Sequence, residues 1–375
     1  MYSGKFSTSM KFVCTKEHLQ KALKGVGGVA GRNPALPILR HVLVKTERGK
    51  LRLAATDLEV GVVTWVAGKI EDSEGTLTIP LKQLTEYVVN LPSDHIHLST
   101  NKGTLTVTCA SAHASFQGET AENFPLIPTV KGGQRFTVKA PDLMSVLDRT
   151  VYAAAADDAR PELSGILLHG KETVVTVAAT DSYRLAESHI RLAEPLEKEF
   201  QLILPLRAAQ ELRRILEGEE SATLTLGDGQ ILVETPTMHL VSRLIDGTYP
   251  DYTQIIPPKT PITISLLRHD LLRAIRAAGI FTSGEANSVL LETAPTSLRV
   301  TATAQELGET VTEVPADVHG DAASIHFNHR FLLDALTVFP SERVRLGLTN
   351  ASVPVVLRPE GSDEQTLALV MPIKT

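Results

Sequence analysis

Residues 178–186 read AATDSYRLA and place a threonine, an aspartate and an arginine among small and apolar residues. One interpretation is a catalytic carboxylate with a basic partner, in which Asp181 and Arg184 would serve a hydrolase. The other is a polar turn between two strands. The rest of the chain can separate the two, because a catalytic carboxylate is rarely repeated at equivalent turns of successive domains.

The same stretch occurs three times along the chain. Alternating strand patterns reach Ala-Thr and then a turn in LRLAATDLEVG, in VVTVAATDSYRLA and in LRVTATAQELGE. Aligning Asp57, Asp181 and Gln305 gives spacings of 124 and 124 residues. Since the third copy carries glutamine in place of aspartate, the polar-turn interpretation is favoured over the catalytic one.

Two further landmarks keep this period. A strand, a helix and another strand recur with turn positions 125 and 123 residues apart, at Pro80, Pro205 and Asn328. A strand and a helix open each copy at positions 124 and 126 residues apart, at Phe12, Phe136 and Ile262. Internal repetition decides the architecture before any single motif does, so the chain is predicted to be three copies of one domain.

Each copy has the pattern of a strand, a helix, several strands, a second strand and helix, and further strands. Two helices against many strands predict an α+β fold, with the helices on one side of antiparallel sheet. The chain of 375 residues exceeds one ordinary core. The expected parts are a disordered N-terminal extension over residues 1–9 and three domains at residues 10–132, 133–257 and 258–375.

Composition excludes several classes of protein. The hydrophobic fraction of 43% and charged fraction of 21% are ordinary for a soluble globular chain, and no apolar run approaches eighteen residues, so no membrane span is expected. The two cysteines are too few for a disulfide framework or a zinc site and fit a reducing cytoplasm. The sequence has no HExxH, GxxxxGK[ST] or GxSxG motif, so no metal, cofactor or catalytic site is predicted.

Positive charge concentrates on the predicted helices, which are expected at residues 16–30, 81–91, 140–156, 206–216, 266–279 and 328–338. They hold twelve Lys and Arg and seven Asp and Glu, a net +5 that leaves −11 for the remainder of a chain with net charge −6. For any single helix, a solvated face is the simpler interpretation. Repetition places all six on one surface, however, and a basic surface on an acidic protein is typical of phosphate binding.

Two of these helices show the pattern in detail. In the fourth, Arg207, Gln210, Glu211 and Arg214 follow the spacing of one exposed face. In the first, Lys21 and Lys24 are expected to point outward from an apolar stripe. Aromatic residues make up only 5% of the chain, which does not favour base stacking along a single strand. Contact with the backbone of duplex DNA, without reading of its sequence, is the better match.

Four motifs then carry a resemblance to a known family. NPALPILRHVLV, ATDSYRLA, SRLIDGTYPDY and the terminal LVMPIKT, together with the threefold repeat, closely resemble the bacterial sliding clamp, the beta subunit of the replicative DNA polymerase. The similarity runs from Met10 to the end of the chain. It implies a DNA clamp fold in which two copies form a ring-shaped homodimer around duplex DNA, with helices lining the hole. It also implies a non-catalytic cytoplasmic protein associated with the nucleoid.

The resemblance implies three sets of site residues. Those facing DNA are Lys21, Lys24, Arg32, Arg160, Arg207 and Arg214. A cleft for short peptides of the clamp loader, the replicative polymerase and repair proteins is formed by Leu163, Thr180, Arg184, Leu185, Pro250, Leu369, Val370, Met371 and Pro372, with Tyr183, Gln254 and Ile373 beside it. The dimer interface is formed by Ala114, Phe116, Ile280 and Phe281.

Three hypotheses follow for function. The leading one is a processivity factor that encircles DNA. An enzyme would need one domain with a unique acidic or nucleophilic constellation, which the repeat does not show. A monomeric scaffold of three protein-binding domains would show no dependence on DNA topology.

Overall fold

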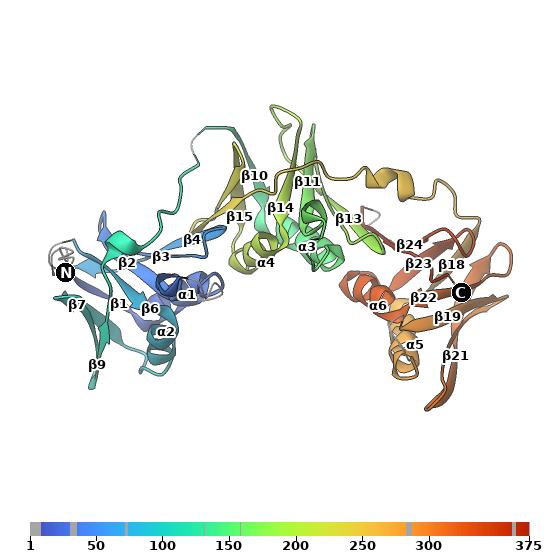
Figure 1. The fold of residues 1–375 in the computed structure, drawn as a ribbon, viewed down its shortest axis with the longest axis horizontal. Helices are drawn as coiled ribbons and strands as arrows, with labels where there is room; N and C mark the ends of the chain where they lie inside the picture. Colours follow the sequence, from blue (N-terminus) through green and yellow to red (C-terminus); the bar gives the residue numbers. More distant parts are fainter. Residues whose placement is uncertain are drawn as a thin grey trace. The chain divides into compact units, whose positions relative to one another are not determined.

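The computed structural model of the chain describes residues 9–30, 36–71, 74–130, 132–157, 159–282, 287–361 and 365–374 (Figure 1). Arg32 and residues 1–8 of the expected extension therefore lie outside the described residues. The chain forms two compact units: unit 1 is Met1–Pro141 with Gln210–Leu244, and unit 2 is Asp142–Ala209 with Ile245–Thr375. No sheet is shared between the two units among the described residues.

Six α-helices lie within the described residues. They are α1 (Lys16–Gly27), α2 (Leu81–Val89), α3 (Ala140–Thr150), α4 (Leu206–Ile215), α5 (Arg268–Ile280) and α6 (His329–Val338). The six predicted helices are confirmed, with each start within two residues of its expected position. Five short 3-10 segments accompany them: η1 (Pro37–Arg40), η2 (Ala121–Asn123), η3 (Val151–Ala153), η4 (Pro161–Leu163) and η5 (Tyr252–Ile255).

Unit 1 contains two antiparallel sheets. The first has the strand order β5-β1-β7-β8-β9, with β1 (Lys11–Thr15), β5 (Lys69–Ile70), β7 (His95–Asn101), β8 (Thr104–Cys109) and β9 (Ala112–Gln117). The second has the order β10-β15-β16-β17-β4-β3-β2-β6. Its strands are β2 (His41–Glu47), β3 (Lys50–Thr56), β4 (Val60–Val66), β6 (Thr76–Pro80), β10 (Gln134–Lys139), β15 (Ser221–Gly227), β16 (Gln230–Glu234) and β17 (Met238–Arg243).

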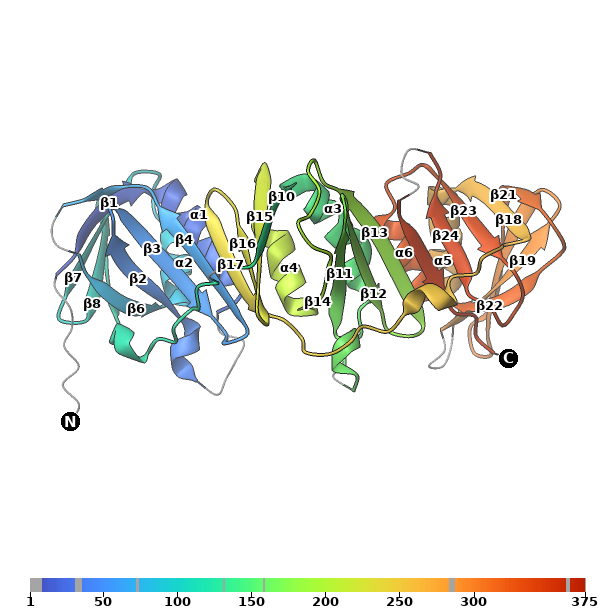
Figure 2. The same ribbon diagram turned by 90° about the horizontal axis from the view of Figure 1, so that it is seen from above.

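Unit 2 contains one long antiparallel sheet in the order β14-β11-β12-β13-β25-β24-β23-β18-β21-β20-β19-β22. Figure 2 shows β23, β24 and β18 of this sheet side by side. Its strands from the second repeat are β11 (Gly165–Lys171), β12 (Val174–Thr180), β13 (Arg184–Arg191) and β14 (Phe200–Pro205). Those from the third are β18 (Ile262–Leu267), β19 (Ser288–Ala294), β20 (Ser297–Ala304), β21 (Gly308–His319), β22 (Ser324–Asn328), β23 (Arg343–Leu348), β24 (Val355–Pro359) and β25 (Leu367–Val370).

Successive repeats are joined by strand pairing. In unit 1, β4 of the first repeat pairs with β17 of the second, with Val60 opposite Ser242. In unit 2, β13 of the second repeat pairs with β25 of the third, with Arg184 opposite Val370. Backbone hydrogen bonds thus continue one sheet in each unit from one repeat into the next, which explains why the two compact units do not follow the repeat boundaries.

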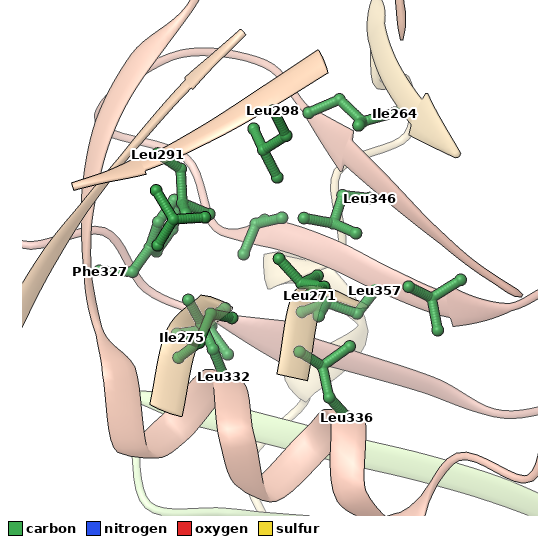
Figure 3. Close-up of a cluster of buried hydrophobic side chains, with 14 of the residues drawn as sticks. Ile264, Leu271, Ile275, Leu291, Leu298, Phe327, Leu332, Leu336, Leu346 and Leu357 are labelled. Atoms are coloured by element: carbon green, nitrogen blue, oxygen red, sulfur yellow. The ribbon is translucent and has the colours of Figure 1, made fainter. Parts of the chain in front are cut away.

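Each repeat buries an apolar core between its helices and its sheet. In the third repeat α5 and α6 lie next to each other and contribute Leu271, Ile275 and Leu332, which meet strand residues such as Leu291 and Phe327 (Figure 3). Leu271, Ile275, Leu332 and Phe327 are fully buried. Apolar residues three and four positions apart on a helix face the same side, so the sequence pattern accounts for this core.

Local signals set where the helices begin. The Thr15 side chain accepts a hydrogen bond from the His18 backbone N–H at 3.4 Å and caps α1. The Asn328 side chain does the same for α6 through the Arg330 N–H at 2.9 Å. Capping side chains satisfy N–H groups that the first turn of a helix leaves free. Among the described helices, none is both long and apolar enough to cross a membrane.

Candidate peptide cleft and charged surfaces

The AATDSYRLA stretch forms a tight polar turn between β12 and β13. The Asp181 Oδ1 atom accepts hydrogen bonds from the backbone N–H groups of Tyr183 and Arg184, both at 2.9 Å. The Thr180 hydroxyl donates to the Arg184 carbonyl at 2.7 Å. Asp57 makes the same contacts in unit 1, with Glu59 at 3.0 Å and Val60 at 2.7 Å. The polar-turn interpretation of these aspartates is therefore confirmed.

The Arg184 side chain is bonded to two carboxylates and lies against two aromatic rings. Its Nε donates to Asp181 Oδ2 at 3.0 Å, and a terminal nitrogen bonds Asp334 on α6. Its guanidinium carbon lies 4.7 Å from the centre of the Phe331 ring and 5.6 Å from that of Tyr152. With its side chain only 15% exposed, Arg184 links the turn of the second repeat to the helix of the third.

A cavity of about 510 Å³ opens beside this turn. Its lining residues come from the turn, from the start of α6 and from the C-terminal tail: Ser182, Tyr183, Asn328, Phe331, Met371, Pro372, Ile373 and Lys374. The rings of Tyr183 and Phe331 stack at 6.5 Å with an interplanar angle of 26°. Because Tyr183 is 65% exposed, the cavity presents a large apolar surface to solvent. Concave apolar sites with a few polar groups are typical of ligand binding.

The C-terminal tail is fixed as one wall of this cavity. The Met371 N–H donates to the Tyr183 carbonyl at 2.8 Å, and the Ile373 N–H donates to the His326 carbonyl at 2.8 Å. Pro372 forms an isolated bridge with Phe327. The tail therefore runs from the turn of the second repeat to the end of β22, just before α6, and backbone hydrogen bonds hold its apolar side chains in place.

The remaining predicted cleft residues also lie in unit 2. Leu163, Leu185 and Leu369 are buried in one apolar cluster with Tyr249 and Tyr252. Thr180 and Val370 are also buried, and Pro250 is exposed. The structure thus brings all nine predicted residues into one unit, although only Met371 and Pro372 line the cavity itself.

The segment that follows β17 is hydrogen-bonded to β13 beside this cluster, through Tyr252 of η5. The Tyr252 hydroxyl donates to Glu187 Oε2 at 2.5 Å, and His189 Nε2 lies 3.3 Å from Glu187 Oε1. Burial would raise the pKa of Glu187, but hydrogen bonds from His189 and Tyr252 outweigh burial and hold the pKa below its ordinary value. Burial, followed by the nearby Glu187 charge, raises the pKa of Tyr252.

Sequence reasoning missed four residues that line the cavity: Ser182, Asn328, Phe331 and Lys374. Asn328 appears in the repeat only as a turn position aligned with two prolines. Phe331 follows it by three residues, which places both near the start of α6 on one side. Their approach to the turn depends on the pairing of β13 with β25, and no local pattern specifies that pairing.

The predicted DNA-facing residues have different environments. Lys21 and Lys24 are exposed on α1, as expected, and Arg160 is exposed before η4, where it bonds the Ser182 hydroxyl. Arg207 is half-buried near the start of α4. Arg32 lies outside the described residues.

The expected exposed face of α4 needs a correction at Glu211 and Arg214. Glu211 is only 5% exposed, and Arg214 Nε donates to its Oε2 atom at 2.9 Å. The other Arg214 nitrogens donate to the Lys24 and Gly25 carbonyls at 2.7 and 2.5 Å. Carbonyls at the end of a helix lack partners within the helix, so Arg214 caps α1 and joins two repeats.

The four predicted interface residues lie at one sheet edge and one helix end. β9 is the last strand of its sheet, and its Phe116 contacts Tyr87 of α2 edge to face at 5.6 Å. Ala114 and Phe116 are half-buried. Ile280, the last residue of α5, is 68% exposed, and Phe281 beside it is half-buried. Large exposed apolar groups of this kind mark interaction surfaces when they gather in patches.

Comparison with known proteins identifies the class: a clamp of three domains, each with helices on antiparallel sheet. The N-terminal, central and C-terminal domains of the DNA polymerase III beta subunit match residues 10–128, 137–251 and 253–374. The chain therefore belongs to the DNA polymerase III beta-subunit family.

Individual relatives cover nearly the whole chain. The beta sliding clamp of Synechococcus elongatus is 31% identical over 97% of this chain and 99% of its own length. That of Chlamydia pneumoniae is 28% identical over 97% and 99%. The crystal structure of a sliding clamp from Pseudomonas aeruginosa bound to griselimycin is 29% identical, covers 98% of this chain and all of its own, and has a TM-score of 0.92. The predicted three-domain clamp fold is confirmed.

Proposed function

We propose that the chain is a DNA sliding clamp, in which two copies close a ring around duplex DNA and tether the replicative polymerase and other DNA-processing proteins. The three domains would meet near residues 132 and 257. The ring holds DNA by topology, because release requires an opened interface or a DNA end, and the protein needs no catalytic group for this. Such a protein would work in the cytoplasm at the nucleoid.

The observation that carries this proposal is that two strand edges join successive repeats, while the equivalent edges at the two ends of the chain have no strand partner in the part that the structure describes. β4, β13 and β21 each begin three residues after the aligned positions Asp57, Asp181 and Gln305. β4 and β13 pair with strands of the following repeat. Within the described residues, Gly308–Pro315 of β21 pair with β20 on one side, while the other side of this segment has no strand partner. β9 has its own free edge.

The repeat also predicts the strand register at the proposed junction between two chains, where β21 would pair with β9 of the partner subunit. Phe116 lies opposite Leu105, as Ser242 lies opposite Ile231 in the next repeat. Since Ser242 pairs with Val60, and Val60 corresponds to Gly308, Gly308 is expected to pair with Phe116 of the partner subunit. An unpaired strand edge is a template for pairing with another chain, and a head-to-tail contact closes a ring when the rotation fits.

The DNA surface is proposed to be the helices. The observed helices hold the same twelve basic and seven acidic residues as the predicted ones. We assign the phosphate contacts to Lys21, Lys24, Arg160 and Arg207, and omit Arg214 because its guanidinium is bonded to Glu211 and to α1. Weak contacts to phosphates confer no sequence preference and permit sliding.

The cleft is proposed to receive short peptides from the clamp loader, polymerases and repair proteins. The cavity beside the AATDSYRLA turn has apolar walls from Tyr183, Phe331, Met371 and Ile373. Leucine and phenylalanine anchors of a peptide suit such walls, and methionine adapts to different partners.

A topological assay tests the ring. The clamp is loaded onto nicked circular DNA by its loader, and the retained protein is measured before and after the circle is cut, with the mass determined by light scattering. A retained dimer that is lost on cutting supports the proposal. Retention that survives cutting but falls with salt indicates an ordinary DNA ligand, and a monomer that is never retained indicates the three-domain scaffold.

A binding assay tests the cleft separately. A fluorescent peptide with leucine and phenylalanine anchors is titrated with the wild type and with Phe331→Ala. Loss of a large apolar wall is expected to raise the Kd about tenfold or more. Leu126→Ala is the matched control, because Leu126 is 96% exposed and lies in unit 1. Equal affinity of wild type and Phe331→Ala would contradict the assignment of this cavity.

A further inference from the structure

An acidic residue recurs at one position of the second helix of every repeat. Glu86, Glu211 and Asp334 each follow the landmark residue before their helix by six positions. The landmarks are Pro80, Pro205 and Asn328. The three acids therefore occupy equivalent places in α2, α4 and α6, and two of them lie at junctions that the structure describes.

At the junction in unit 1 the acid is buried and paired. Glu211 is 5% exposed and is bonded to Arg214. It packs against Gly28 at the end of α1, where an added Cβ would fall 1.9 Å from Glu211 Oε2. A buried carboxylate is costly unless it is paired and hydrogen-bonded, and Arg214 meets that need.

At the junction in unit 2 the acid is paired as well. Asp334 bonds Arg184, whose guanidinium lies over the Tyr152 ring. Tyr152 corresponds to Gly28, because each lies nine residues after the first buried leucine of its helix, at Leu143 and Leu19. The two intrachain junctions therefore share one arrangement: an acid on the second helix, an arginine, and the end of the preceding repeat's first helix.

The third junction lacks both arginines. The position of Arg214 carries Val89, and the position of Arg184 carries Gly308. The helix end that corresponds to Gly28 and Tyr152 is Ile280, nine residues after Leu271. Glu86 has Lys82 at 3.9 Å on its own helix, but this pair is 80% and 65% exposed. Exposed pairs of this kind contribute little to stability.

We propose that Glu86 weakens the junction between the two chains. This inference rests on the proposed homodimer. Closing the ring brings the Glu86 carboxylate toward Ile280 of the partner subunit, at a junction where neither Arg214 nor Arg184 has a counterpart. The two intrachain junctions do not carry this cost, because Arg214 and Arg184 pair with the equivalent acids.

The test measures the dimer Kd of wild type, E86Q and V89R by light scattering over a dilution series. E86Q removes the charge and is expected to lower the Kd about tenfold for each junction, a change of about 1.4 kcal/mol. A ring has two such junctions, so the Kd of the dimer would fall about a hundredfold. V89R restores the arginine of the first junction and is expected to lower the Kd in the same direction.

A double variant shows whether the two residues act on each other. In E86Q/V89R the gain from the arginine should shrink, because its carboxylate partner is absent. Leu126→Arg adds the same charge to an exposed position outside α2 and should leave the Kd unchanged. These variants alter exposed residues, so each should fold like the wild type, which circular dichroism checks.

The outcomes separate this inference from the proposed function. A wild type that stays monomeric at every concentration overturns the homodimer itself. A dimeric wild type with an unchanged or raised Kd in E86Q overturns the role of Glu86, since a raised Kd would mean that Glu86 has a stabilising partner across the junction. A dimeric wild type whose V89R variant does not tighten overturns the equivalence of the junctions.

Discussion

Arg214 illustrates how a charged residue on a helix can serve the fold rather than a ligand. Its guanidinium caps two carbonyls of α1 and pairs with Glu211. Removing it leaves a buried carboxylate and two helix-end carbonyls without a donor. The side chain is 27% exposed, so water compensates for part of the loss.

We therefore expect Arg214→Ala to lower the free energy of unfolding by about 2 kcal/mol. Urea unfolding of the purified variants, followed by circular dichroism, measures this change. Gln210→Ala is the control, because Gln210 is exposed on the same helix and its loss should cost less than about 0.5 kcal/mol. An unchanged free energy of unfolding in Arg214→Ala would show that its bonds to Glu211 and to α1 contribute nothing to stability.

The Tyr252–Glu187 bond makes stability depend on pH. Glu187 has a pKa held below its ordinary value, so its contribution is present above the unfolded-state pKa near 4.3 and is lost as the pH falls through the lower folded-state pKa. Tyr252→Phe removes one bond to the carboxylate and should cost about 1–2 kcal/mol at pH 7. As the pH falls through the lowered folded-state pKa of Glu187, the difference from wild type should narrow, because the carboxylate then becomes protonated in both proteins.

Unfolding by urea at pH 7, 5 and 3.5 measures this difference. Tyr183→Phe serves as the control, since the Tyr183 side chain is largely exposed and its hydroxyl lies outside this network. A gap that stays constant over this pH range would mean that Tyr252 acts through packing alone.

At the scale of elements, two neighbouring glycines at the end of α1 should respond to alanine with opposite sign. A Cβ at Gly27 meets nothing within 4 Å, whereas one at Gly28 would fall 1.9 Å from Glu211 Oε2. Gly27→Ala gains helix propensity of up to about 0.5–1 kcal/mol. Gly28→Ala forces Glu211 away from Arg214 and is expected to cost about 1–3 kcal/mol.

Thermal unfolding of the two variants beside wild type measures both effects. A shift of the same sign in both would contradict the close approach of α4 to the end of α1. The pair needs no other control, because both substitutions add the same methyl group one residue apart.

At the scale of the whole molecule, ring closure and peptide binding should be separable. The cavity beside the AATDSYRLA turn is lined by that turn, the start of α6 and the C-terminal tail, and Ile280, at the end of α5 in the same unit, is not among its lining residues. Ile280→Asp places a charge in the proposed interface and is expected to yield a monomer. The monomer should bind the peptide with a Kd within about twofold of wild type, yet should not be retained on circular DNA.

Light scattering, peptide titration and the retention assay measure these three properties on one preparation. Leu126→Asp is the control for an added charge at an exposed leucine, and it should remain a dimer. If Ile280→Asp stayed dimeric, the interface would lie elsewhere on the molecule.

The sequence by itself determined the repeat, the six helices and the polar turns. Each depends on short-range physics: apolar spacing along a helix, capping at Thr15 and Asn328, and a carboxylate that binds the N–H groups two and three residues ahead of it. The family resemblance then pointed to the cleft residues, and the structure places all nine of them in unit 2. Local patterns sufficed wherever the interacting residues are close in sequence.

Only the tertiary structure decided which polar side chains of the helices are exposed to solvent and which are buried in contacts between repeats. The same helical spacing describes Gln210, which is exposed, and Glu211, which is buried. The difference arises because β17 pairs with β4 and carries α4 against the end of α1. Phe331 and Lys374 likewise join the cavity only because β13 pairs with β25. Strand pairing across repeats links residues more than a hundred positions apart, and no local pattern specifies it.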